Sequence, residues 1–440
     1  MRALRTAETR LRDHDPGTLP EASVLPFVQL DGDAAHCVAG GALLSVTSDL
    51  DLIEEEWRAF EQRADCTPFQ TFAWLSTWQR CIGLPAGVMP AIVTGRRLTG
   101  ELLFLLPLAI EPGKFLNRLT FLGQALCDYN APLIAPDFQD HVSTADFAAI
   151  WTAARKLLQR TAGCRYNLIF LDKMPERIGE QCNPMAALAT MLNPNAAYMT
   201  ALGENWDKFY AEKRSSATRQ RDRSKRKKLA ATGELVMVSP NTPGEMWGTL
   251  GVLFGQKSRW FARRGVPDLF ARAGHTEFFL SVAAAAREFV HVSRLDAGAT
   301  CIAANFGLVF RDCYFHILAS YDDGALTRFG PGAAHLHELM RYAIAQGCER
   351  YDFTIGDESY KLDWADTKVD LFDHVSGAGW LGRLVALAVT VGVRAKRRIK
   401  ASPELWRAAS RLRALLVSGK QRQRGSTSSA GSSTGTKAAA

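Results

Sequence analysis

The stretch GCERYDFTIGDESYKLDWA, residues 347–365, decides the fold of this chain. Apolar and polar side chains alternate from Tyr351 to Ile355, which is the period-two pattern of a β-strand. The pattern is broken at Gly356, and two acids, a serine, a tyrosine and a lysine follow directly. The stretch therefore predicts a buried strand that ends in a cluster of charged and hydroxyl-bearing side chains.

A similar pattern occurs earlier in the chain. AGCRYNLIFLDKMP (residues 162–175) resembles QGCERYDFTIGDES (residues 346–359), and each copy follows a stretch with helical periodicity. The helices are expected at 147–160 and 333–346, and hairpin-like strand pairs are expected before them at 90–110 and 290–310. A strand, a helix and a strand in this order imply a parallel pair with a right-handed crossover. The repeat predicts an α/β protein with two tandem modules, each built on a mixed sheet.

Composition divides the chain further. We expect a first module at 42–200, a basic helical connector at 201–233, a second module at 234–378, basic amphipathic helices at 379–418 and a disordered, low-complexity tail at 419–440. Residues 383–440 hold thirteen Lys and Arg and one acid, whereas the other 382 residues hold 40 basic and 44 acidic residues, a net charge of −4. The overall net charge of +8 is thus a property of the C-terminal segment.

The sequence disfavours several classes of protein. The nine cysteines are scattered and form no C-x-x-C pair, so we expect neither a disulfide framework nor a metal site. The first 26 residues lack the apolar core of a secretory signal, and no run of about eighteen apolar residues marks a membrane span. We therefore expect a cytoplasmic protein, with peripheral contact to the inner face of the plasma membrane as an option.

The segment RFGPGAA, residues 328–334, has the features of an anion-binding loop at the start of a helix. Gly330 and Gly332 allow a ligand to approach the backbone closely, and Pro331 fixes the first helical residue. The free amides of the first turn and the charge of Arg328 favour a phosphate or diphosphate. A plain turn before a helix is the alternative interpretation.

The first module has no counterpart to this loop. Its segment 135–151 offers Ser143 and Asp146 as helix caps but contains no pair of glycines. An anion site is therefore expected in the second module alone. This asymmetry suggests that the second module does chemistry, while the first is non-catalytic or shapes the acceptor site.

Four segments, in this order along the chain, resemble the GNAT acyltransferase superfamily. They are EEEWRAFEQRADCTPFQTFAWLSTWQRC (54–81), SSATRQRDRSKRKKLAATGELVM (215–237), RFGPGAAHLHELM (328–340) and YDFTIGDESYK (351–361). More narrowly, the chain looks like the double-module, CelD-like branch of polysaccharide and cellulose biosynthesis, which is related to the FemAB peptidyltransferases. The resemblance covers about residues 45–375.

This resemblance implies acetyl-CoA or another acyl-CoA as the donor. In the superfamily two parallel strands splay apart, the pantetheine arm lies in the gap, and the diphosphate rests on the N-terminus of the next helix. The splayed strands would be 314–321 and 350–356. The implied cofactor-binding residues are Arg328, Gly330, Gly332, Ala333, Leu318 and Ala319. Pro331 departs from the glycine that is usual at its position, and this removes one amide donor.

The cluster after the strand supplies candidate catalytic residues. Acyl transfer from a thioester needs a base, donors for the oxyanion and an acid for the leaving thiolate. Asp357 or Glu358 is the candidate base, and Asp352 is a rival. Tyr360 is the candidate acid. The alternative is an exposed turn with an ion pair to Lys361.

Other side chains are candidates for acceptor or phosphate binding. They are Lys361, Arg259, Trp260, Arg263, Asp128, Tyr129, Asn130 and His316. Residues 128–130 are included because the matching stretch of the family faces the cleft between the modules. Surface helix packing is the alternative for residues 259–263, and a core histidine is the alternative for His316.

Two further segments of the chain are strongly basic. Residues 213–228 hold nine basic residues and one acid. This composition fits a solvated helix, or a surface that binds the phosphates of CoA, of a sugar nucleotide or of a lipid-linked acceptor. Nucleic acid is a less expected ligand, although FemAB relatives can take aminoacyl-tRNA. Residues 379–400 combine an apolar stretch with a basic cluster, which fits an interfacial helix on anionic lipid or packing on the body.

Three functions follow from these patterns. The first is transfer of an acyl group from acyl-CoA to an amine or hydroxyl of a sugar or polysaccharide precursor. The second is a catalytically silent binding or scaffold protein of a polysaccharide biosynthesis complex, which the loss of a donor at Pro331 favours. The third is a FemAB-like, aminoacyl-tRNA-dependent transferase.

Overall fold

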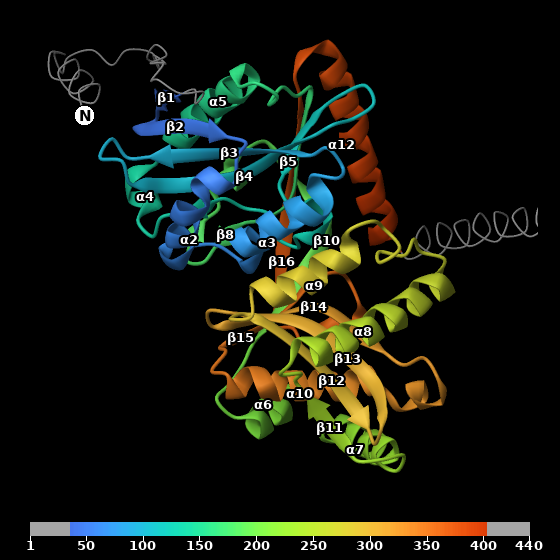
Figure 1. The fold of residues 1–440 in the computed structure, drawn as a ribbon. Coiled ribbons are helices and arrows are strands. Elements are labelled where there is room, and N and C mark those ends of the chain that lie inside the picture. Colours follow the sequence, from blue (N-terminus) through green and yellow to red (C-terminus); the bar gives the residue numbers. More distant parts are fainter. Residues whose placement is uncertain (1–35, 403–440) are drawn as a thin grey trace, which may run out of the picture.

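The structure is a computed structural model that describes residues 36–402 (Figure 1). Its main sheet has fourteen strands in the order β1-β2-β3-β4-β5-β7-β16-β10-β15-β14-β13-β12-β11, with β6 paired to β4. The expected tail at 419–440 and the end of the expected helices at 379–418 lie outside the described residues. The predicted α/β class with a mixed sheet is confirmed.

The first half of the molecule runs from β1 to β10. Its strands are β1 (His36–Ala39), β2 (Ala42–Thr47), β3 (Met89–Arg96), β4 (Leu102–Glu111), β5 (Arg118–Phe121), β6 (Leu133–Ile134), β7 (Leu168–Pro175), β8 (Arg177–Ile178), β9 (Gln181–Cys182) and β10 (Thr190–Ala201). Its helices are η1 (Asp51–Ile53), α2 (Glu54–Arg63), η2 (Pro68–Gln70), α3 (Phe72–Trp78), η3 (Gln79–Gly83), η4 (Gln124–Leu126), α4 (Phe138–His141), α5 (Thr144–Arg160) and η5 (Pro184–Ala187).

The second half runs from α6 to β16, and one long helix follows it. The strands are β11 (Leu235–Val238), β12 (Val290–Ala297), β13 (Thr300–Phe310), β14 (Cys313–Tyr321), β15 (Arg350–Ile355) and β16 (Thr367–Gly377). The helices are α6 (Trp206–Lys213), α7 (Ser216–Ala230), α8 (Pro243–Arg264), α9 (His275–Ala285), η6 (Ala325–Phe329), α10 (Pro331–Ala345), α11 (Ser359–Leu362) and α12 (Gly379–Ala401).

Each half contains one parallel pair of strands. β5 pairs with β7 in the first half, and β14 pairs with β15 in the second; the other neighbours in the sheet are antiparallel. The β14–β15 pairing covers three residue pairs and ends at Phe315 and Asp352. β14 continues to Tyr321, so its second half and the end of β15 lie side by side without pairing. The pairing thus stops within the two strands that the resemblance to the GNAT superfamily implies to be splayed.

The two halves exchange their last strands. β10, at the end of the first half, pairs with β15, and β16, at the end of the second half, pairs with β7. β10 and β16 also pair with each other, so the sheet runs without a break across the molecule (Figure 1). Each half is therefore completed by a strand of the other, which fixes their relative position.

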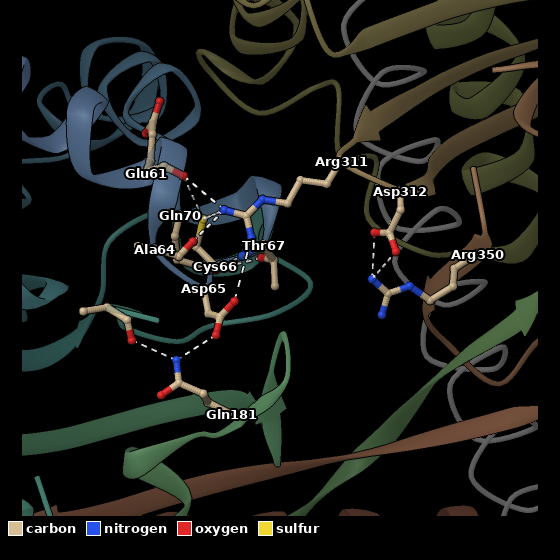
Figure 2. Close-up of polar contacts among 11 residues, drawn as sticks. Glu61, Ala64, Asp65, Cys66, Thr67, Gln70, Gln181, Arg311, Asp312 and Arg350 are labelled. Carbon is tan, nitrogen blue, oxygen red and sulfur yellow. Dashed lines mark hydrogen bonds and ion pairs between the residues drawn. The ribbon is translucent and has the colours of Figure 1, made fainter. Parts of the chain in front are cut away.

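Side chains also join the halves on one side of the sheet. Helix α3 packs against α9, where the rings of Trp74 and Phe278 meet edge to face at 5.0 Å. Close to this contact, Arg311 in the β13–β14 turn donates hydrogen bonds to the main-chain oxygens of Glu61 (3.2 Å) and Ala64 (2.5 Å), as Figure 2 shows. The resulting common core holds the first-half segments over β14 and β15.

Candidate active site

The start of α10 leaves backbone amides available for a ligand. Gly330 precedes the helix with φ 66°, and no side chain caps the helix end. Within residues 36–402, the amides of Gly332 and Ala333 donate no hydrogen bond. A Cβ on Gly332 would lie 2.9 Å from Cδ1 of Tyr321, so the ring rests directly on this glycine. The loop thus offers two free amides, because Pro331 has none to give.

The other predicted cofactor-binding residues surround this helix end. Arg328 is exposed, and its guanidinium lies 4.8 Å from the centre of the Phe329 ring. Leu318 and Ala319 lie on the part of β14 that pairs with β13 but not with β15. The edge of β14 that does not pair with β15 therefore lies close to the two free amides of α10 and to the Arg328 guanidinium.

Asp352 lies at the point where β14 and β15 separate, and it bonds to the first half. Both of its carboxylate oxygens accept from the hydroxyl of Tyr129, at 2.9 and 2.8 Å. The amide of Thr354 donates to the same carboxylate at 2.7 Å. Burial raises the pKa of Asp352 to about 7. Because the side chain is fully enclosed by these donors, Asp352 holds Tyr129 in place.

Thr354 has a backbone conformation that is unusual for a β-branched residue. Its φ is 57°, in the left-handed region. This conformation turns its amide back to Asp352, and its hydroxyl donates to the main-chain oxygen of His316 at 3.3 Å. Strain of this kind persists only where surrounding contacts enforce it, and it gathers at functional sites.

Lys361 closes the end of β15 from below. Its buried ammonium group donates to the main-chain oxygens of Thr354 (3.3 Å) and Ile355 (2.9 Å). It also forms an ion pair with Glu358 at 3.1 Å. The ion pair to Lys361, which the sequence analysis gave as an alternative, is present. Lys361 also donates hydrogen bonds to the main chain of β15.

Asp128 enters this cluster from the first half. The charged groups that act on its carboxylate include Lys173, Lys361 and Glu358, and Thr354 is a hydrogen-bonding neighbour. Burial raises the pKa of Asp128 above its usual value, against the opposing effect of the two lysines. A carboxyl group with a raised pKa beside the splayed strands can act as a general base near neutral pH.

The remaining predicted catalytic side chains lie on the exposed segment that follows β15. Asp357 and Glu358 are exposed, and the hydroxyl of Tyr198 donates to Asp357 at 3.4 Å. The ring of Tyr360 packs edge to face on Phe353 at 6.3 Å. Partial burial and the Glu358 carboxylate raise the pKa of Tyr360, so its hydroxyl keeps its proton at neutral pH and can donate it.

His316 and Asn130 have structural partners. The Nδ1 atom of His316 lies 2.9 Å from the hydroxyl of Tyr351, and burial lowers the pKa of the histidine to about 3. The amide side chain of Asn130 donates to the main-chain oxygen of Asp172 at 3.0 Å. His316 is thus a neutral core histidine, and Asn130 orders the loop that carries Asp128.

The predicted arginine cluster on α8 is not part of the carboxylate cluster. Arg259 and Arg263 form ion pairs with Asp323, at 3.1 and 2.5 Å. The guanidinium of Arg264 lies 4.4 Å from the ring centre of Trp260. These contacts order the end of α8 against the loop that follows β14.

Sequence reasoning missed a second lysine at the site. Lys257 on α8 lies near Glu358 and Lys361, and burial lowers its pKa. It follows Leu250, Leu253 and other apolar residues at helical spacing, so it is a cation on the apolar face of an amphipathic helix. A lysine on the apolar face of a predicted helix is the sequence signal that could have identified Lys257 as a site residue.

The basic helix α7 lies beside the glycine loop. Arg226 forms an ion pair with Glu338 on α10 at 2.6 Å, and the ammonium of Lys228 lies 5.6 Å from the centre of the Phe329 ring. Four further cations of this helix are exposed, namely Arg221, Arg223, Lys225 and Lys227. The arrangement places a cationic surface next to the two free amides.

Comparison with known proteins agrees with this geometry. Residues 216–362, which include the glycine loop and Asp352 but not Asp128, match the family described as "Acetyltransferase (GNAT) domain". A GNAT domain is thus present in the second half, and the prediction of an acyltransferase is confirmed. Comparison with curated protein sequences finds no match.

Three solved structures are similar to this chain at low sequence identity. FemX is 11% identical, with a TM-score of 0.52 over 73% of this chain and 96% of its own. A tandem GNAT protein from the clavulanic acid biosynthesis pathway is 11% identical, with a TM-score of 0.44 over 77% of this chain and 100% of its own. A conserved protein from Bacteroides thetaiotaomicron is 12% identical, with a TM-score of 0.46 over 76% and 99%. The likeness to FemX shows a shared fold.

Proposed function

We propose that this chain transfers an acyl group, normally acetyl, from acyl-CoA to an amine or hydroxyl of a sugar or polysaccharide precursor. The observation that carries the proposal is the uncapped start of α10 beside the unpaired edge of β14. A diphosphate fits the amides of Gly332 and Ala333 and the charge of Arg328. An extended pantetheine arm fits the edge that β14 presents, since its amide groups can pair with strand backbone.

The side chains at the splayed strands suit the chemistry. In our proposal Asp128 accepts the proton of the acceptor as the nitrogen or oxygen attacks the thioester carbon. The carbon–sulfur bond breaks, and Tyr360 gives its proton to the leaving thiolate. Burial raises the pKa of Asp128, which makes its carboxylate a stronger base, and the raised pKa of Tyr360 keeps its hydroxyl protonated.

The acceptor is proposed to enter between the two halves. Tyr129 and Asp128 belong to the first half, whereas Asp352 and Glu358 belong to the second, and the Tyr129–Asp352 bond joins them at 2.8 Å. The saccharide class rests on the resemblance of residues 328–340 and 351–361 to the CelD-like branch.

Aminoacyl-tRNA is the second candidate donor. The exposed cations of α7 adjoin α10, and a cationic surface of this kind suits the phosphates of a nucleic acid. A scaffold role is the third candidate, because Pro331 leaves one amide fewer at the loop.

Calorimetric titration separates these candidates. Acetyl-CoA is titrated into the full chain, and labelled tRNA is offered in a filter-retention assay. We expect a saturable heat with acetyl-CoA and release of free CoA thiol when hexosamines are added. Retention of tRNA without any heat from acetyl-CoA would support the second candidate, and silence in both assays would support the third.

A further inference from the structure

Helix α12 packs on the sheet with only one of its faces. It lies on β16, β10 and β7, the strands at which the two halves meet, and it follows one side of the molecule in Figure 1. Its buried positions are small: a Cβ on Gly382 would lie 2.0 Å from the main-chain oxygen of Asn167, and Ala386 is buried. Small residues allow the helix to lie directly on the strands.

The opposite face carries an apolar stripe. Trp380, Leu384, Leu387 and Val391 are 74%, 56%, 63% and 57% exposed. Their spacing of four, three and four residues places them on one line along the helix. Large side chains at this exposure form a contiguous patch, which in soluble proteins marks a contact surface.

Cations flank the stripe. Arg383 lies within it, and four exposed basic residues follow it, namely Arg394, Lys396, Arg397 and Arg398. The helix contains no acidic residue. An apolar line that ends in a dense positive charge is the composition of helices that lie in the interface of an anionic bilayer.

The charge of α12 indicates which partner can cover its exposed apolar face: the C-terminal segment, a second copy of the chain or a lipid surface. Residues 403–440 hold seven basic residues and one acid, so this segment repels the cationic end of α12. A second copy of the chain would bring the same positive helix. An anionic lipid surface complements both the stripe and the cations. Among residues 36–402, no helix is long and apolar enough to cross a membrane.

We propose that α12 binds the surface of a membrane rich in anionic lipid, with the apolar stripe in the headgroup region and its axis in the membrane plane. This surface is separate from the proposed acyl-transfer site, so it holds whatever the donor is.

Vesicle flotation with the full-length protein tests the proposal. One set of vesicles contains phosphatidylcholine alone, and the other contains equal parts of phosphatidylcholine and phosphatidylglycerol. We expect binding to the second set, and we expect added salt to weaken it. The double variant Leu384→Glu with Leu387→Glu should lower the partition coefficient at least about tenfold. Leu52→Glu, at another exposed leucine, is the matched control and should bind as the wild type does.

Further measurements make each outcome decisive. Thermal unfolding of the double variant should match the wild type, because both leucines are exposed. Arg394→Gln with Arg397→Gln should reduce binding to the anionic vesicles. Equal binding to both sets, or no binding at all, would overturn the proposal. Light scattering that shows a wild-type dimer, with a monomeric double variant that leaves vesicle binding unchanged, would overturn it in favour of a second copy.

Discussion

The first turns of α5 and α10 occupy equivalent places in the two halves, between the members of a parallel strand pair, and they are built differently. In α5 the hydroxyl of Ser143 accepts from the amide of Asp146, and the Asp146 carboxylate accepts in return from the Ser143 amide. In α10 the preceding residue is Gly330, and no side chain fills the helix end. One helix satisfies its own amides, and the other keeps them for a ligand.

The strands that follow these helices share a second feature. Lys173 near the end of β7 and Thr354 near the end of β15 both have left-handed backbone, with φ of 56° and 57°. Each amide donates to an aspartate: Lys173 to Asp373 at 3.0 Å, and Thr354 to Asp352 at 2.7 Å. In the first half, the ammonium of Lys173 donates to the main-chain oxygens of Gln124 and Cys127, in the segment that follows β5. The two halves therefore share a left-handed residue that donates to an aspartate, and they differ in the capping of the helix that precedes it.

The largest effect is expected from Asp128→Asn, because in our account this first-half carboxylate acts in the second-half site. Loss of a general base should reduce kcat about 10³-fold, with little change in acetyl-CoA affinity. Release of CoA thiol with a hexosamine acceptor measures the rate. The rate of the wild type should rise with pH through the raised pKa of Asp128, and this limb should be absent in the variant.

Asp357→Asn and Glu358→Gln are the controls for that change, since both side chains are exposed in the segment that follows β15. Each should alter kcat only a fewfold. A large loss of kcat in Glu358→Gln, together with a wild-type kcat in Asp128→Asn, would show that the base lies in the second half. That result would contradict the proposed role of Asp128.

A comparison of Asp352→Asn with Asp373→Asn tests, through stability, the two aspartates that accept from the amides of Thr354 and Lys173. The folded pKa of Asp352 is about 7, above the usual ~3.9, so its protonated form favours folding and this contribution is lost as pH rises through about 7. Asparagine mimics the protonated form. The stability gained by Asp352→Asn relative to the wild type should therefore grow between about pH 4 and about pH 7, to roughly 4 kcal/mol, and stay constant above that range.

The gain should be smaller for Asp373→Asn, because burial raises the pKa of Asp373 only to about 6. Urea unfolding at several pH values measures both. If the free energies of unfolding of Asp352→Asn and the wild type changed in parallel with pH, the pKa of Asp352 would not be raised in the folded protein.

Gly332→Asp tests the open helix end. An acid at the second helical position repels a diphosphate, and its Cβ also displaces the Tyr321 ring from this position, so acetyl-CoA affinity should fall about 100-fold. Ala145→Asp is the matched control, since Ala145 is exposed at the same position of α5. Calorimetry should give the wild-type affinity for that variant, and an equal loss in both would remove the distinction between the two helices.

The smallest effect is expected from Ser143→Ala. Loss of the capping hydroxyl in α5 should cost about 1 kcal/mol of stability, with unchanged acetyl-CoA binding. Thermal unfolding and calorimetry measure the two quantities. A change in acetyl-CoA binding would imply that the self-capped helix also takes part in donor binding.

Periodicity and the internal repeat were sufficient to predict the parallel strands, the helices before them and the glycine loop. Asp352 is buried as deeply as its apolar neighbours Tyr351 and Phe353, so burial along this strand does not follow the alternation of the sequence. The partner of Asp352 could not be predicted, because Tyr129 is 223 positions away in the chain. The exchange of β10 and β16 was missed for the same reason, since a strand pattern does not specify its neighbours.

The engagement of Lys361 with main-chain oxygens and the approach of Lys257 also depend on tertiary packing. Charge alone made Lys361, Arg259 and Arg263 equal candidates for ligand binding. The structure separates them, because Arg259 and Arg263 pair with Asp323 in the loop after β14, whereas Lys361 pairs with Glu358 at the proposed site.

A crystal structure of the full chain with bound CoA tests the central claim most directly. The account predicts a diphosphate within hydrogen-bonding distance of the amides of Gly332 and Ala333, and a pantetheine arm along β14 beyond Phe315. A CoA molecule bound elsewhere, with the start of α10 covered by side chains, would contradict it.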